Sequence, residues 1–152
     1  MPTLIAYRKH VTPEITRELR LPEDAQTRQR LGTELATLDG VTYVSLPDSV
    51  SLPADQPDEI AASIISITPD AVLKAAIKAT SPHVRLINSL VVEKIRALYS
   101  VDDEMYFARI AGGASVGLYT PSEDEMNKLT VYGEHAEACR AWGRQQKALL
   151  GL

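Results

Sequence analysis

The C-terminal stretch, residues 121–150, reads PSEDEMNKLTVYGEHAEACRAWGRQQKALL and predicts one long helix. Ser122 and Glu125 form a capping box, and Gly151 is a natural stop. Acidic residues crowd the first turn and basic residues gather toward the end, as the helix dipole favours. At 1.5 Å per residue the helix is about 45 Å long, more than the width of a compact domain of this size. We therefore expect it to overhang its domain or to lie against another subunit.

Apolar residues recur along this helix at spacings of three and four and form one face. They are Met126, Leu129, Tyr132, Ala136, Cys139, Trp142 and Leu149, with Gln146 as a polar interruption. Small side chains between Gly133 and Gly143 keep part of the helix thin, so that another backbone can approach closely. Two interpretations stay open: the face packs on the chain's own core, or it contacts another molecule.

Composition restricts the rest of the interpretation. The chain has 152 residues, enough for one domain or for one domain with an arm, and 45% of them are hydrophobic. The net charge is −4 with no basic tract, so nucleic acid is not an expected partner. No apolar run approaches the ~20 residues of a membrane span, and no secretory signal pattern opens the chain. A single cysteine allows no intrachain disulfide, and we expect Cys139 to be a small buried hydrophobe.

The N-terminal part, residues 1–46, predicts a β-hairpin. Asp39-Gly40 lies between Leu35–Leu38 and the β-branched run Val41–Leu46, and this dipeptide suits a type I′ turn. Thr3–Tyr7 is a further candidate strand. Thr12-Pro13-Glu14 looks like a helix start, although the residues after it allow either a short helix or a strand. Residues 22–31 allow a helix or a loop.

Residues 47–59 are linker-like, because three prolines between Pro47 and Pro57 oppose strand pairing. We interpret the segment as an extended arm that joins the N-terminal part to a helical domain, residues 60–152; an ordinary surface loop is the alternative. The arm carries an acidic excess and a few apolar anchors such as Leu52. Asp58–Ile67 reads either as a short helix or as an apolar strand.

Three more helices are predicted before the long one. The first opens at Thr68-Pro69 and ends near Thr80, with Val72, Ala76 and Ala79 as its core stripe. The second opens at Ser81-Pro82, and the third is capped by Ser100. Their expected inward residues are Val84, Ile87, Val91, Ile95 and Leu98, then Phe107 and Ile110. Gly112, Gly113 and Gly117 mark the loop that follows. The predicted fold class is α+β, mainly helical.

No catalytic, cofactor-binding or metal-binding pattern emerges. The three histidines have no ligand spacing, and the acidic run at Asp102 lacks the alternation of a calcium loop. The glycine-rich run at Gly112 lacks the ending of a phosphate loop. We therefore expect a protein that is not an enzyme and holds no cofactor. A small soluble enzyme built from residues far apart in sequence remains an alternative.

Three stretches of the C-terminal half carry a resemblance to a known group. They are IRALYSVDDE at 95–104, the segment from Tyr132 to Arg144, and the ending KALLGL at 147–152. They resemble small accessory proteins of tailed bacteriophages, especially tail and tail-fibre-associated proteins. The resemblance implies a structural component of the virion, in its tail, connector or fibre attachment, assembled in the host cytoplasm. An assembly chaperone or adaptor that is absent from the mature particle is the alternative.

The expected partners are copies of the chain and other virion proteins, with no nucleic acid, membrane or small-molecule substrate. The arm and the long helix together give a predicted assembly interface. Its residues are Leu52, Leu129, Tyr132, Gly133, Ala136, Cys139, Trp142, Gly143 and Leu149.

Overall fold

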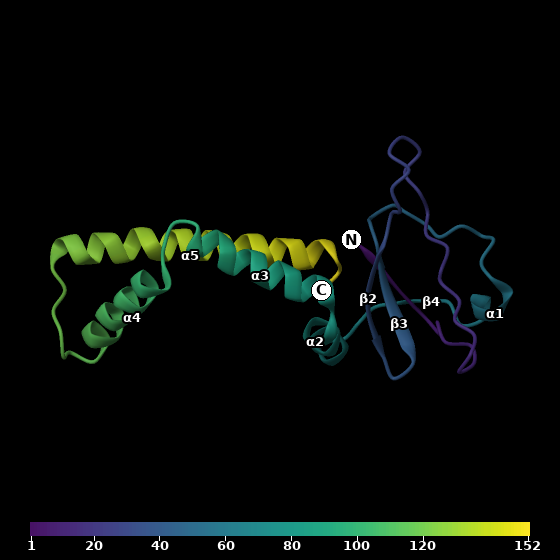
Figure 1. Ribbon diagram of the computed structural model, residues 1–152, viewed down its shortest axis with the longest axis horizontal. Coiled ribbons are helices and arrows are strands. Elements are labelled where there is room, and N and C mark those ends of the chain that lie inside the picture. Colours follow the sequence, from purple (N-terminus) through teal and green to yellow (C-terminus); the bar gives the residue numbers. More distant parts are fainter. The chain divides into compact units, whose positions relative to one another are not determined.

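A computed structural model describes all 152 residues and confirms an α+β, mainly helical fold (Figure 1). The chain divides into two compact units. The first, which we call the sheet unit, comprises Met1–Arg85 and Gln146–Leu152; the second, the helical unit, is Leu86–Gln145. The division differs from the boundaries expected at residues 46 and 60, because a strand beyond residue 60 joins the sheet. No helix is long and apolar enough to cross a membrane.

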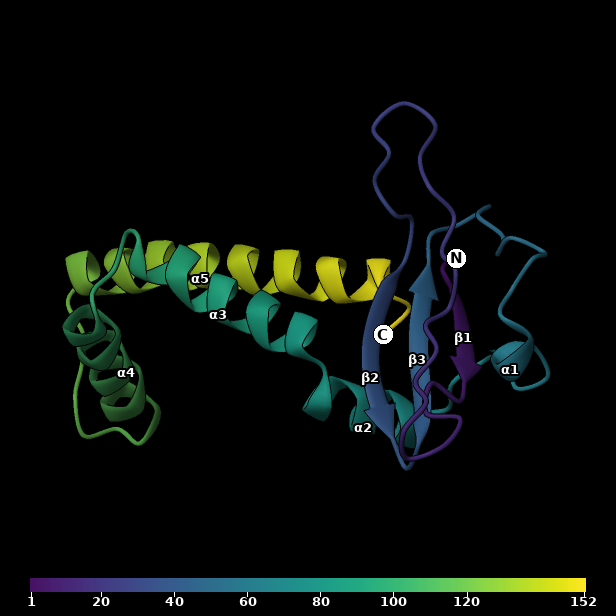
Figure 2. The same cartoon turned by 45° about the vertical axis from the view of Figure 1, so that its right-hand side comes forward.

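The sheet unit contains one antiparallel sheet with the strand order β2-β3-β1-β4. Figure 2 shows β2 (Thr33–Leu38), β3 (Val41–Leu46) and β1 (Thr3–Tyr7) side by side. The predicted hairpin and first strand are confirmed. Asp39 and Gly40 have φ angles of 49° and 78°, the positive values that a type I′ turn requires.

Both faces of this sheet are buried, because alternate residues of a strand point to opposite sides. Ile5 and Tyr7 join one apolar cluster, whereas Leu4 joins the other. The second cluster includes Ile77 of α2 and, at its margin, the chain end at Leu150 and Leu152. This end is fixed by a Schellman cap, in which the Leu152 amide donates to the Lys147 carbonyl and Gly151 has φ 78°.

The segment between β1 and β2 forms no helix, so the helix start expected at Thr12 is wrong. Thr12 instead closes a turn in which its hydroxyl accepts a hydrogen bond from the Ile15 amide. Leu19 is buried and its amide donates to the Tyr7 hydroxyl, and the Arg20 backbone amide donates to the Gln56 side chain. These tertiary contacts hold the chain extended and outweigh the local capping signal.

The proline-rich segment also lies on its own chain. Leu52 packs against the Ile5–Tyr7 cluster, and the Gln56 side chain bonds to the backbone carbonyls of Arg20 and Pro53. Leu52 is therefore an anchor within the sheet unit, a correction to its expected role on a neighbouring molecule. Residues 58–67 form both of the predicted alternatives, α1 (Asp58–Ala61) and the edge strand β4 (Ile65–Ile67).

Helix α2 (Ala71–Thr80) starts later than expected, because Asp70 and not Thr68 caps it through the Leu73 amide at 2.8 Å. Its buried face consequently carries Ile77 and Leu73 and packs against β2. The expected core stripe is wrong, since Val72 is 78% exposed.

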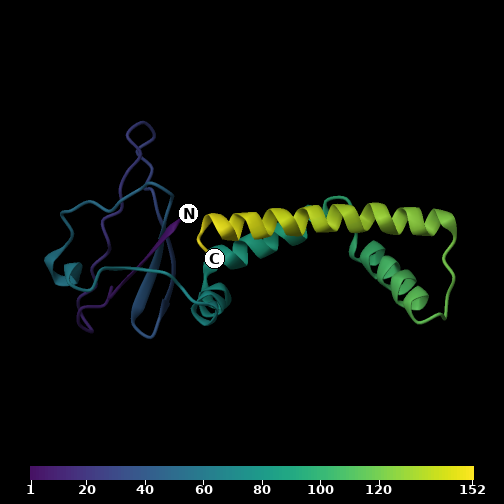
Figure 3. The ribbon, with the colours of Figure 1, turned by 180° about the vertical axis from the view of Figure 1, so that it is seen from behind.

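Helices α3 (Pro82–Arg96), α4 (Val101–Ser115) and α5 (Glu123–Leu149) confirm the three remaining helix predictions. The predicted capping box of Ser122 and Glu125 forms at the start of α5. The predicted cap at Ser100 is also present, and Asp103 completes a second capping box there. Gly112 and Gly113 lie inside α4, so the expected glycine loop is shorter and begins after Ser115. Figure 3 shows the connection from α4 into the start of α5.

Within the helical unit, the predicted face of α5 packs on its own chain. Ala136 and Cys139 join Ile95 of α3 in one core cluster, with Val91 and Tyr132 at its margin. Gly143 is buried, and a Cβ atom added to it would lie 2.5 Å from Val91 Cγ2. The interpretation in which this face packs on the chain's own core therefore holds for Ala136, Cys139 and Gly143. The inward positions on α3 and α4 are confirmed except Leu98, which is 69% exposed.

Candidate functional site

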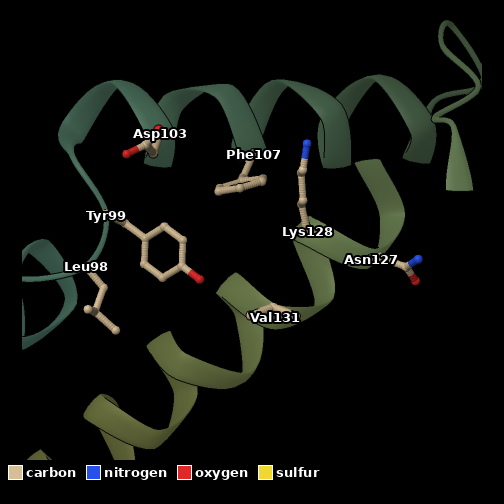
Figure 4. Close-up of a pocket in the computed structure, with 7 residues that line it drawn as sticks. All are labelled: Leu98, Tyr99, Asp103, Phe107, Asn127, Lys128 and Val131. Carbon is tan, nitrogen blue, oxygen red and sulfur yellow. The ribbon is translucent and has the colours of Figure 1, made fainter. Parts of the chain in front are cut away.

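The helical unit contains a pocket of about 450 Å³ between the first half of α4 and the start of α5 (Figure 4). We call it the α4–α5 pocket. Its lining residues are Leu98, Tyr99, Asp103, Phe107, Asn127, Lys128 and Val131. The volume falls in the range of pockets that hold small ligands or partner side chains. Most of the lining is apolar, so the pocket suits an apolar group.

Tyr99 and Phe107 form the aromatic floor of the pocket, and both rings pack against Tyr132, which lies outside the lining. Phe107 and Tyr132 stack with ring centroids 4.9 Å apart, and Tyr99 meets Tyr132 edge-on at 5.1 Å. Figure 4 shows the Tyr99 and Phe107 rings projecting into the space between the two helices. The capping box at Ser100 fixes the register of α4 and thereby turns Phe107 inward, where it is 7% exposed. The floor is thus preformed by packing within the unit.

The charged groups at the rim, Asp103 and Lys128, already make hydrogen bonds within the chain. The Ser100 side chain and amide hydrogen-bond to Asp103, which holds the pKa of that carboxyl below its ordinary value. Lys128 lies 2.7 Å from Asp124, and this contact raises the pKa of the ammonium group. Neither group is poised near neutral pH as a general acid or base. The rim of the pocket is therefore polar and hydrogen-bonded, whereas its floor is apolar.

A second cavity of about 280 Å³ lies against Tyr106, Arg109, Ile110, Tyr119 and Glu125. Glu125 accepts hydrogen bonds from the Ser122 amide, from Tyr119 at 2.7 Å and from Tyr106 at 3.2 Å. These bonds lower the pKa of the Glu125 carboxyl, and the bond to Glu125 raises the pKa of Tyr119. The network ties the connection after α4 to the first turn of α5, so its role is structural.

Cys139 and His135 lie one turn apart on α5, although their spacing in the sequence matches no known catalytic motif. Their Sγ and Nε2 atoms lie 3.6 Å apart, and Nε2 is also 3.2 Å from the Lys94 carbonyl. A carbonyl only accepts, so Nε2 carries the proton in that bond and cannot take one from the thiol. Cys139 is 7% exposed and behaves as the buried hydrophobe that the sequence predicts.

The sheet unit has two adjoining grooves of about 330 and 120 Å³, which share four lining residues: Glu18, Leu19, Leu21 and Arg30. Their rims carry ion pairs of Arg20 with Asp55 at 2.6 Å and of Lys9 with Glu34 at 2.9 Å. No group of three or more potential metal-binding side chains occurs anywhere in the structure. These grooves bring charges of both signs together and favour no single ligand class.

The structure divides the predicted assembly residues into three sets. Leu52 packs within the sheet unit, and Ala136, Cys139 and Gly143 are buried by α3, so these four do not form a free surface. Leu129, Tyr132 and Trp142 are partly buried, and Trp142 lies under the Lys94 ammonium at 4.7 Å from the ring centroid. Only Gly133 and Leu149 are exposed.

The exposed apolar surface lies instead on residues that the sequence analysis did not single out. Leu118 is 87% exposed, Val116 67% and Val131 58%. The segment from Ala111 to Ser122 contains no charged residue, and this is the sequence signal that could have indicated an exposed apolar surface. Its glycines instead favoured the interpretation as a flexible turn.

Comparison of the chain with protein-family models, curated proteins and solved structures finds no match. Function is therefore argued from the residues and from the resemblance noted in the sequence.

Proposed function

We propose that this chain is a non-enzymatic assembly protein that contacts other proteins through its helical unit. One observation carries the proposal: eleven of the seventeen exposed large apolar residues lie between Leu86 and Val131. Single exposed apolar residues are normal, but a concentration of them in one small unit is typical of an interaction surface. Burial of that surface by a partner would supply the main driving force for association.

The α4–α5 pocket fits this role better than a catalytic one. Its floor is aromatic, and Asp103 and Lys128 are held by hydrogen bonds within the unit. A partner side chain entering the pocket would meet mainly apolar atoms, and the charged groups at the rim already have hydrogen-bond partners. Such a contact avoids the desolvation penalty that makes buried charges costly.

The setting that we propose is a tailed-bacteriophage virion, in which the protein belongs to the tail, the connector or the fibre attachment. The resemblance of residues 95–104, 132–144 and 147–152 to phage accessory proteins supports this setting. Its partners would be copies of itself and other virion proteins, joined in the host cytoplasm. The alternative is an assembly chaperone, which would use the same surface and then leave the particle.

Quantitative mass spectrometry of purified particles tests the proposal. A Met105→Asp variant should enter particles less well than wild type, because Met105 is a 58% exposed residue of the helical unit. The matched control is Val72→Asp, a 78% exposed position on α2 in the sheet unit, which should enter normally. Binding to assembly intermediates without retention in particles would favour the chaperone. Absence from both would contradict the proposed function.

A further inference from the structure

The connection between α4 and α5 contains an exposed apolar segment, Val116–Tyr119, which we call the knob. Leu118 is 87% exposed and Val116 is 67% exposed, and neither has a charged neighbour between Ala111 and Ser122. The knob is nevertheless held in place. The amides of Leu118 and Tyr119 donate to the Gly113 carbonyl at 3.0 and 3.2 Å, and Gly117 takes a φ of 70°. A preorganised apolar projection loses little conformational entropy when it docks.

The same unit contains a candidate binding site for this knob, the α4–α5 pocket. Truncation of a buried leucine leaves a cavity of roughly 150 Å³. The pocket of about 450 Å³ therefore has room for the Leu118 side chain together with a neighbour. Leu98 and Val131 at the mouth are 69% and 58% exposed, so no part of the chain itself fills the pocket.

We propose that Val116–Tyr119 of one copy docks into the α4–α5 pocket of a second copy. The inference rests on the proposed assembly function and names one partner, the chain itself. Complementarity supports this occupant, because an uncharged segment meets an aromatic floor whose charged rim groups already make hydrogen bonds within their own chain. Leu118 is 87% exposed and so does not fill the pocket of its own molecule, which leaves its side chain available to a second copy.

The available area is sufficient for a specific contact. Six side chains at the knob and the pocket offer roughly 100 Å² of apolar surface each. Since an interface is only about 57% apolar, this corresponds to a total of about 1,000 Å², where specific interfaces begin. Those residues are Leu98, Tyr99, Val116, Leu118, Tyr119 and Val131. Interfaces at this lower end of the size range are typical of weak or transient complexes.

Sedimentation velocity across about 1 to 100 µM, concentrations that bracket a micromolar Kd, tests the inference. Wild type should exceed its monomer mass of 16.6 kDa as concentration rises. Leu118→Asp places a charge on the knob, and Val131→Glu places one at the mouth of the α4–α5 pocket. Each should weaken association at least ~30-fold, the effect of losing an interface hot spot. Val72→Asp is the matched exposed control and should associate like wild type.

Mixing the two defective variants gives the sharpest readout. Leu118→Asp keeps an intact pocket and Val131→Glu keeps an intact knob, so an equimolar mixture should form a heterodimer although each variant alone is monomeric. Far-UV circular dichroism confirms folding, and Leu118→Ser replaces the aspartate variant if that one unfolds.

The inference is overturned if wild type stays monomeric throughout, if both variants associate like wild type, or if the mixture does not complement. The first result, found together with normal incorporation into particles, would remove self-docking and leave the assembly function standing.

Discussion

The substitution Gly143→Ala probes how closely α3 and α5 approach each other in the helical unit. An alanine Cβ would lie 2.5 Å from Val91 Cγ2, below the separation of any normal carbon contact. Val91 is β-branched and therefore stiff at χ1, so it cannot simply rotate away. We expect the two helices to separate slightly and to lose packing.

The magnitude follows from two opposing effects. Overpacking a well-packed interface by one methyl group costs about 1–3 kcal/mol. Alanine is a better helix former than glycine by about 0.8–1.0 kcal/mol. The net expectation for Gly143→Ala is a loss of about 1 kcal/mol in the free energy of unfolding. Gly133→Ala is the matched control on the same helix: its new Cβ meets nothing within 4 Å, so we expect a gain of about 0.5–1 kcal/mol.

Urea unfolding followed by far-UV circular dichroism measures both substitutions. The most specific result comes from a double-mutant cycle, because Val91→Ala removes the methyl group that Gly143→Ala would strike. In the Val91→Ala background, Gly143→Ala should become stabilising by about 1 kcal/mol, a reversal of sign. If Gly143→Ala stabilises the wild-type background as much as Gly133→Ala does, the close approach of the two helices is refuted.

Three further outcomes are expected. Gly40→Val should cost about 1–2 kcal/mol in urea unfolding, because the turn holds Gly40 at φ 78°; unchanged stability would argue against a type I′ turn. Ala136→Trp should prevent folding of the helical unit and not merely its association, since Ala136 is 1% exposed, and a folded monomer would contradict this. Asp103 and Glu125 have lowered pKa values, so their capping bonds stabilise the protein above the unfolded-state pKa and are lost as pH falls through the folded-state values. Urea midpoints should therefore decrease with acidification below about pH 4.5, and less so in Glu125→Gln, unless the caps contribute nothing.

Much of the fold follows from local chemistry in the sequence. The Asp39-Gly40 turn and the Ser100 and Ser122 caps each depend on a few adjacent residues, and the structure contains all three. The helix expected at Thr12 fails because Leu19 and Arg20 are held by contacts with Tyr7 and Gln56, far away in sequence. Nonlocal contacts of this kind override local propensity and leave no periodic signal.

The candidate site was harder to predict for the same reason. The apolar face of α5 was visible in the sequence, but whether it contacts this chain or another depends on where α3 lies. The α4–α5 pocket combines Leu98, Phe107 and Val131 from three separate segments, so no single motif reveals it. The exposure of Leu118 depends on the turn at Gly117. In the sequence this glycine indicates a flexible turn, but it does not indicate which side chain the turn exposes.

Cross-linking mass spectrometry of purified particles tests the central claim most directly, with an amine-reactive reagent that reports on the six lysines. The claim is that the helical unit forms the contact surface with other subunits. We predict that the protein is present and that its intermolecular cross-links concentrate on Lys128, which lines the α4–α5 pocket. Intermolecular cross-links confined to Lys74 and Lys78 of α2, or the absence of the protein from both particles and assembly intermediates, would contradict the claim.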